Sequence, residues 1–96
     1  MKKATHSKVH KRRVSFSLEA PQARQVSLVG DFNAWDPQKH VMKKGADGIW
    51  EKTVILVPGT YEYKFYQDRQ WIVDPQNDRQ CPNRFGTRNN IVVVSP

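Results

Sequence analysis

The chain has 96 residues, three tryptophans, one cysteine and a formal net charge of +7. This length allows a single domain with one core and excludes a large enzyme with a deep active site built from many loops. No window approaches the roughly 18 consecutive apolar residues of a membrane helix, and Met1 is followed by lysines and polar residues. The sequence therefore predicts a soluble, unexported, cytoplasmic protein that has no membrane partner.

The positive charge is concentrated at the start of the chain. Residues 1–13 hold six of the 16 basic residues and no acid, whereas the rest holds ten basic and nine acidic residues. We therefore expect a basic flexible arm over residues 1–13 and a nearly neutral domain over residues 14–96. The arm could contact nucleic acid, anionic lipid or an acidic partner, although a solvated tail is the simpler interpretation.

Apolar and polar residues alternate in the first half of the domain, which is typical of half-buried strands. The expected strands cover residues 14–18, 25–29 and 49–57. In the third strand Lys52 falls on the same face as Trp50. Either Lys52 packs its stem near an edge and keeps its ammonium wet, or the expected register is locally wrong.

The second half continues the strand pattern. A Pro-Gly turn at residues 57–60 precedes a strand over 61–66, whose odd positions, all aromatic, are expected in the core. Those residues are Tyr61, Tyr63 and Phe65. A short reversal at 67–70, a strand from Trp71 to Val73, a long polar connection over 74–83 and a last strand over 90–94 follow. No segment has a helical period with caps at both ends, so the sequence predicts an all-β, antiparallel β-sandwich.

Catalytic and metal sites have no support in the sequence. The acidic residues are scattered over turns and strands, and no two of them are placed as an acid and base pair. Cys81 and the three histidines, His6, His10 and His40, have no metal-ligand spacing, and no serine lies in a nucleophile elbow. We therefore expect no enzyme activity, no catalytic residue, no metal and no cofactor.

Two tryptophans are not accounted for by the expected core. Trp35 ends the turn motif G-D-F-N-A-W at 30–35, in which Phe32 is expected to point inward, and Trp71 follows a polar reversal. Each ring alone could serve packing. Together with Lys64 on the outward face they suit a sugar, because an indole packs on the C–H face of a glucose ring while polar groups bond its hydroxyls.

Single-stranded nucleic acid is the rival ligand, since the same rings could stack on bases and the arm could contact phosphates. The acidic residues around the two tryptophans disfavour this interpretation, because they would repel phosphates. Those residues are Asp31, Asp36, Asp68 and Asp74.

Six motifs then occur in order between about Val14 and Val94. They are V-S-L-V-G-D-F-N-A-W at 26–35, D-G-I-W at 47–50, P-G-T-Y-E-Y-K-F at 58–65, Q-W at 70–71, D-P at 74–75 and F-G-T-R-N-N at 85–90. With these motifs the chain resembles the family 48 carbohydrate-binding modules. That family includes the glycogen-binding domain of the AMP-activated protein kinase β subunit and the early-set domains of isoamylases and glycogen branching enzymes.

The resemblance implies an immunoglobulin-like β-sandwich that binds α-1,4-glucan, such as glycogen, starch or maltooligosaccharide. By matching positions it implies that Trp35 and Trp71 stack on glucose rings and that Lys64 bonds sugar hydroxyls. It also implies that Phe85, Thr87 and Asn89 complete the carbohydrate-binding site from the final loop.

Two positions depart from the pattern of the kinase-type domains. Phe85 replaces the common leucine, so stacking is expected where that leucine inserts into a curved glucan. Asp68-Arg69 replaces the frequent Asp-Gly of the hairpin, which implies a different turn.

The leading hypothesis is thus a non-catalytic, stand-alone glucan-binding module. An alternative is a protein-interaction or accessory domain that docks on a glycoside hydrolase, a branching enzyme or a kinase-like complex and binds little sugar. Nucleic-acid binding through the basic arm ranks third.

Overall fold

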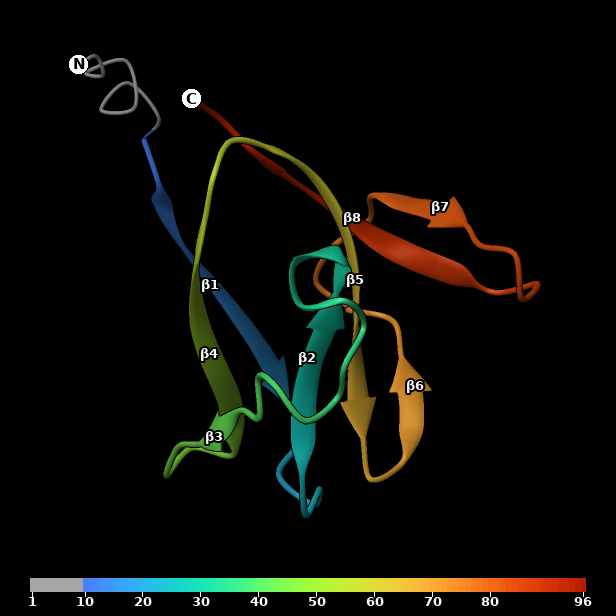
Figure 1. Cartoon of the computed structure of the whole chain (residues 1–96). Coiled ribbons are helices and arrows are strands. Elements are labelled where there is room, and N and C mark those ends of the chain that lie inside the picture. The colour runs from blue at the N-terminus through green and yellow to red at the C-terminus, as the bar shows by residue number, and fades with distance from the viewer. Residues whose placement is uncertain (1–9) are drawn as a thin grey trace.

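The computed structural model describes residues 10–96, which form two antiparallel β-sheets with the core between them (Figure 1). The predicted all-β sandwich is confirmed. The expected flexible arm falls largely on residues 1–9, which lie outside the described residues, as does His6. The first strand begins at Arg12, so the last two residues assigned to the arm belong to the sheet.

The smaller sheet has the strand order β1-β4-β3 and the larger sheet the order β2-β5-β8-β7, with β6 also paired to β5. The strands of the smaller sheet are β1 (Arg12–Glu19), β3 (Lys43–Lys44) and β4 (Ile49–Leu56). Those of the larger sheet are β2 (Val26–Gly30), β5 (Gly59–Gln67), β6 (Gln70–Ile72), β7 (Gln80–Pro82) and β8 (Arg88–Val94). The 3₁₀ turn η2 (Asp31–Asn33) follows β2.

Strand β5 changes its neighbour halfway along its length. Its first half pairs with β8 as far as Tyr63, and its second half pairs with β6 from Phe65 onward. Lys64 lies at the change, and β6 and β8 run in different directions from it (Figure 1). The strand pairing on this side of β5 is therefore interrupted at Lys64.

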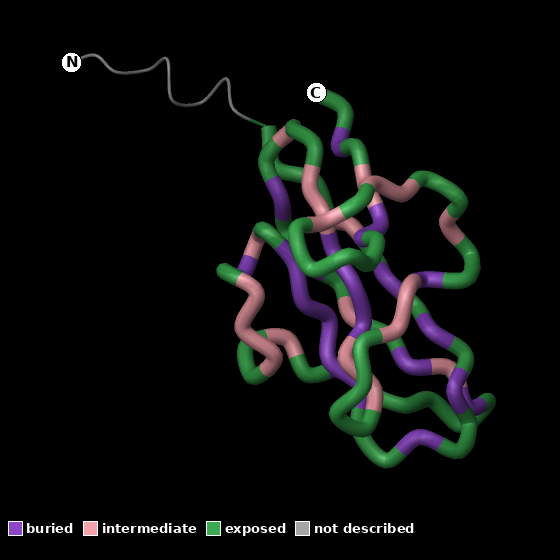
Figure 2. Tube along the Cα trace, turned by 90° about the vertical axis from the view of Figure 1, so that its right-hand side faces the viewer, coloured by how far each residue is buried: buried purple, intermediate pink, exposed green. Residues whose placement is uncertain are grey.

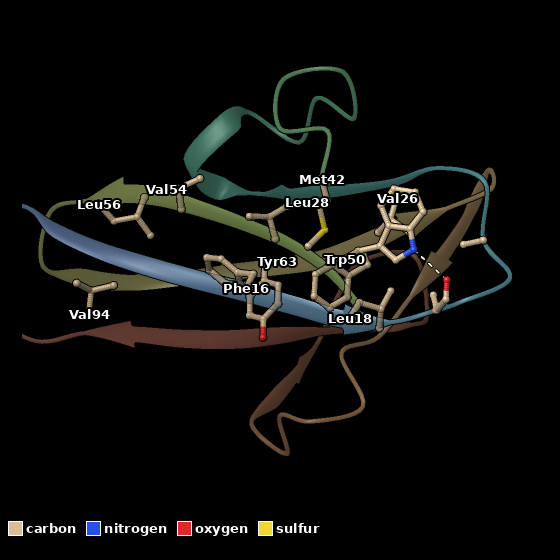
Figure 3. Close-up of a cluster of buried hydrophobic side chains, with 13 residues drawn as sticks. Phe16, Leu18, Val26, Leu28, Met42, Trp50, Val54, Leu56, Tyr63 and Val94 are labelled. Atoms are coloured by element: carbon tan, nitrogen blue, oxygen red, sulfur yellow. Dashed lines mark hydrogen bonds between the residues drawn. The ribbon is translucent and has the colours of Figure 1, made fainter. Parts of the chain in front are cut away.

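The inward faces of both sheets supply one core, as the alternating pattern predicts (Figures 2 and 3). Tyr63 and Phe65 are buried, and Tyr61 is half-buried against the edge of the core. Trp50 is also buried, and its indole N–H donates a 2.9 Å hydrogen bond to the carbonyl of Ala20, the dashed line in Figure 3. This bond satisfies the one polar group that the large ring brings into the core.

The expected register of β4 is correct around Lys52. Trp50 and Val54 are buried on the same face, and Lys52 between them is half-buried. Strand β3 pairs with β4 only at Glu51 and Trp50, so β4 has no ladder partner on that side beyond them. Lys52 therefore lies beside an unpaired edge of β4, where a lysine can pack its stem and keep its ammonium in solvent.

Three expectations about the second half need correction. The long connection after Asp74 contains a strand, β7, which pairs with β8, and β8 itself begins two residues earlier than expected. The hairpin between β5 and β6 keeps a two-residue turn in which Asp68 and Arg69 both have positive φ, 48° and 71°. Positive φ at both central residues is the type I′ geometry that Asp-Gly favours, so the expected change of turn is wrong.

Candidate functional site

All six side chains that the sequence singles out line one groove, which has a volume of about 1130 Å³. They reach it from the turn after β2, from strands β5, β6 and β8, and from the β7–β8 loop. The residues are Trp35, Lys64, Trp71, Phe85, Thr87 and Asn89. The groove lies beside the point where β5 exchanges β8 for β6. The role of these six residues in ligand binding stays a prediction.

Close contact between two strands explains the glycine of the G-D-F-N-A-W motif. Gly30 is extended, and a Cβ built on it would lie 2.5 Å from the carbonyl oxygen of Glu62 and 2.9 Å from the Cβ of Tyr63. Any side chain at this position would push β2 away from β5. Glycine thus lets the chain leave β2 directly against β5 and begin the turn at the groove.

The turn itself is strained at the residue that carries the indole. Ala34 and Trp35 both have left-handed backbones, with φ of 57° and 59°, a conformation that costs non-glycine residues of order 1 kcal/mol each. The backbone N–H of Trp35 donates to the carbonyl of Gly30 at 3.0 Å. Phe32 points the other way and packs against the core near Phe16, which confirms its predicted inward role.

The carboxylate of Asp31 fixes the orientation of the Trp35 ring. One oxygen accepts the indole N–H at 3.0 Å, and the other accepts the backbone N–H of Glu62 on β5 at 2.7 Å. Both carboxylate oxygens are therefore engaged, and the edge of the indole is tied to the sheet. In the sequence Asp31 stands out only as a charge near Trp35, because its residue type does not identify its hydrogen-bond partners.

Trp71 forms the second aromatic wall and is 48% exposed. It lies directly opposite Tyr66 across the β5–β6 ladder, and the two rings pack with centroids 4.6 Å apart. The rings of Trp35 and Trp71 lie 6.3 Å apart at an interplanar angle of 60°. The groove therefore has two adjacent aromatic surfaces that meet at an angle.

Lys64 lies at the floor of the groove, and its side chain is only 6% exposed. The sequence places Lys64 on the face opposite Tyr63 and Phe65, and its position in the groove lining agrees, although the residue is buried and not exposed. Its ammonium donates to the hydroxyl of Thr87 at 3.1 Å, and burial lowers the pKa of Lys64 from its ordinary value of 10.5. Lys64 and Thr87 thus form one fixed polar pair.

Asn83 is a site residue that sequence analysis missed. Its side-chain oxygen accepts the backbone N–H groups of Phe85 and Thr87, at 2.9 and 3.1 Å. Its amide nitrogen donates to the Thr87 hydroxyl and to the side chain of Asn89. The sequence offers one signal for Asn83, which is an asparagine just before a turn. This signal does not reveal the hydrogen bonds that Asn83 makes across the loop.

The loop that Asn83 organises presents Phe85 to solvent. The ring is 77% exposed, and the guanidinium carbon of Arg84 lies 5.1 Å from its centroid. A large apolar side chain with this exposure is available to a ligand, and the cation over one face leaves the other face open.

Acidic and neutral polar groups complete the walls. Asn89 donates to the Glu62 carboxylate at 3.0 Å, so this carboxylate, like that of Asp31, is fixed at the groove.

Partial burial and the neighbouring Glu62 raise the pKa of the Cys81 thiol, which favours its protonated form. Among residues 10–96, no group of three potential metal ligands occurs, and no helix is long and apolar enough to cross a membrane.

Comparison with known proteins places the chain in a family. Residues 13–96 match the family described as the glycogen recognition site of AMP-activated protein kinase. The chain belongs to this family, and its fold and its resemblance to glycogen-binding modules agree with that assignment. A carbohydrate-binding module is therefore the class of protein that the chain represents.

Individual relatives are much longer than this chain. It is 48% identical over 52 residues to the 1,4-alpha-glucan branching enzyme GlgB of Trichormus variabilis, covering 54% of this chain and 7% of that enzyme. It is 40% identical over 73 residues to Protein PTST homolog 2, chloroplastic, of Arabidopsis thaliana, covering 76% of this chain and 13% of that protein. A further branching enzyme, from Novosphingobium aromaticivorans, is 48% identical over 59 residues, which are 60% of this chain and 8% of the enzyme.

Proposed function

We propose that the groove binds α-1,4-glucan by stacking glucose rings on Trp35 and Trp71. The observation that carries the proposal is the convergence of two partly exposed indoles, a cation and several amides on one groove. The chain's membership of a glycogen-recognition family supports this ligand class. The proposed role is recognition alone, with no bond made or broken.

The angle between the two indoles favours a curved chain. Successive glucose units of an α-1,4-glucan turn relative to one another, so two platforms inclined at 60° can face two neighbouring units. A flat polymer would meet one platform and miss the other. Phe85, exposed at the rim, adds a third apolar surface that a curved chain can reach by stacking.

The polar groups of the floor suit sugar hydroxyls. The Lys64 ammonium bonds only Thr87 among the described side chains, so it retains hydrogen-bond donors for a ligand. The amide of Asn89 and the hydroxyl of Thr87 lie beside it. The Asp31 and Glu62 carboxylates can accept from hydroxyls, and they disfavour a phosphate chain.

The expected affinity is modest. Covering part of one indole face removes on the order of 50 Å² of apolar surface, which contributes roughly 1 kcal/mol per ring. Two rings and several water-exposed hydrogen bonds give dissociation constants of roughly micromolar to millimolar, which repetition along a polymer strengthens. Because the relatives are far longer than this chain, we extend the proposal to a role in bringing a glycogen-metabolising enzyme or a kinase-like partner to its glucan.

Titration with maltoheptaose or β-cyclodextrin tests the proposal. Trp35→Ala and Trp71→Ala are each expected to weaken binding about fivefold or more, and the double variant to abolish it at millimolar sugar, since each ring supplies roughly 1 kcal/mol. Amide chemical shifts measure both the affinity and the fold.

A matched control is Ile55→Ala, which removes an exposed side chain of β4 on the other sheet and should leave binding unchanged. A wild-type protein that gives no shift changes at millimolar sugar would refute the proposal. Unfolding of either tryptophan variant would instead assign that ring to structure.

A further inference from the structure

A hydrogen-bonded cluster around Asn33 connects the turn that carries Trp35 to His40 in the following loop. Asn33 is 4% exposed, and its side-chain oxygen accepts the backbone N–H of Gly30 at 3.1 Å. Its amide nitrogen lies 2.9 Å from the carbonyl oxygen of Leu28 and 2.8 Å from the Nδ1 atom of His40. These contacts use every polar atom of the Asn33 side chain.

The pattern fixes the direction of each bond. Since the Gly30 N–H needs an acceptor and the Leu28 carbonyl needs a donor, the Asn33 oxygen must face Gly30 and its nitrogen must face Leu28 and His40. The Asn33 nitrogen can only donate, so the Nδ1 atom of His40 must accept. His40 is therefore neutral, with its proton on Nε2.

Protonation of His40 would place a second N–H at Nδ1, opposite the amide N–H at 2.8 Å. Two donors cannot bond each other, so this bond would be lost and replaced by repulsion. The backbone of His40 could not simply withdraw, because its carbonyl accepts the N–H of Leu28 on β2 at 2.9 Å. Asn33 and the 30–35 turn that it holds would therefore have to change conformation.

The surroundings of His40 favour the neutral ring. Lys52 from β4 and Lys39 from the same loop are the charged groups that act on it, and the Phe32 ring of η2 packs with its centroid 6.1 Å away. The neighbouring strand β2 carries no titratable residue. Partial burial, followed by the charges of Lys52 and Lys39, lowers the pKa of His40 from its ordinary value of 6.5.

We propose that His40 is a positioning residue of the glucan groove, whose neutral imidazole holds Asn33 and so keeps the 30–35 turn in the conformation that presents Trp35. The expected effect on glucan affinity rests on the proposed function. The expected link between His40 protonation and the conformation of the Trp35 turn does not. The turn needs such support because Ala34 and Trp35 adopt left-handed backbones that other arrangements would relieve. Acid should therefore loosen the Trp35 wall of the groove while leaving the Trp71 wall in place.

The sign of the effect follows from the lowered pKa. In the unfolded chain, or when it is released from Asn33, His40 binds a proton more readily than it does while bonded to Asn33. The hydrogen bond between Asn33 and His40 is therefore fully present above about pH 6.5, and it weakens as the pH falls toward the lowered pKa of His40. Glucan affinity is expected to fall about fivefold between about pH 7.5 and pH 5, which corresponds to one lost hydrogen bond.

A titration of the wild-type protein without sugar tests the coupling by itself. Two-dimensional NMR reports the imidazole nitrogens of His40 and the three indole N–H groups. The Trp35 indole resonance is expected to shift with the same midpoint as the His40 ring, while the indole of Trp50 in the core stays unmoved. A Trp35 resonance that does not follow His40 would overturn the inference, whether or not sugar binds.

Variants test the effect on binding. His40→Asn places a non-titrating oxygen where Nδ1 lies, so it is expected to bind maltoheptaose as the wild type does at about pH 7.5 and to lose the pH dependence. Lys52→Gln removes a neighbouring positive charge and should move the midpoint to higher pH. His10→Asn, at an exposed position, is the matched control and should keep the wild-type profile. An unchanged pH profile in His40→Asn would overturn the inference; loss of sugar binding at every pH in all proteins would instead refute the proposed function.

Discussion

Asn83 organises the final loop of the groove through a single amide group that bonds two backbone N–H groups and two side chains. Asn83→Ala is expected to weaken glucan affinity roughly five- to tenfold, because Phe85 and Thr87 lose their common anchor. The free energy of unfolding should change by about 1 kcal/mol or less, since the loop lies at the surface. Calorimetric sugar titration and urea unfolding measure the two quantities.

Asn83→Asp distinguishes the role of the accepting oxygen of this side chain from that of its donating nitrogen. The aspartate keeps an oxygen for the N–H groups of Phe85 and Thr87 but loses the donor to the Thr87 hydroxyl and to Asn89. Its affinity should fall between those of the wild type and Asn83→Ala. Equal affinities for all three proteins would show that the loop does not take part in binding.

The side chains that line the groove could be predicted, whereas the residues that hold them in position could not. Trp35 and Trp71 stand out because the expected core has no place for them, and Lys64 stands between two core aromatics. Asp31 and Asn83 act through bonds to groups that are distant in the chain, and their residue types alone are typical of any turn. Residue type predicts the capacity to bond, but only the fold provides the partner.

Both central residues of the β5–β6 turn have a positive φ, but only one of them makes side-chain hydrogen bonds that offset its cost. Asp68 has positive φ, but its carboxylate accepts the backbone N–H groups of Arg24 and Gln25. Arg69 has a φ of 71° and makes no side-chain hydrogen bond among the described residues. Its Cβ therefore carries a conformational cost that no contact offsets.

Arg69→Gly is expected to raise the free energy of unfolding by about 0.5–1 kcal/mol, because glycine adopts the left-handed region without that cost. Urea unfolding measures the change. Gln70→Gly, at the first position of β6, is the matched control and should destabilise the protein, since strand positions gain nothing from glycine. A destabilised Arg69→Gly would mean that the turn is not strained at this residue.

Strands with alternating or β-branched apolar residues could be predicted to within a few residues, whereas β7 could not. β1, β4 and β5 each place apolar side chains on one face, so their inward residues are clear from the sequence. β7 contains only Gln80, Cys81 and Pro82 and lies at the edge of its sheet, where a proline is tolerated. Its pairing with β8 depends on the fold and leaves no periodic signal.

At the scale of the whole molecule, the distribution of charge separates the sugar and nucleic-acid hypotheses. Glucan affinity is expected to change less than about twofold between roughly 50 and 500 mM salt, because the ligand is neutral. Nucleic acid bound through basic residues would lose affinity by orders of magnitude over the same range. Deletion of residues 1–9 should leave sugar affinity unchanged, and a steep salt dependence or a loss on deletion would contradict the glucan assignment.

The ends of the described chain lie together at one end of the sandwich (Figure 1), where the Arg12 side chain donates to the carbonyl of Ser95 at 3.3 Å. The groove loop lies at the other end of β8, which a seven-residue strand places about 20 Å away. A linker or an anchoring surface attached at either end would thus leave the groove facing outward. If the groove binds glucan as proposed, anything attached at that end of the sandwich would be held about one strand length from the bound polymer.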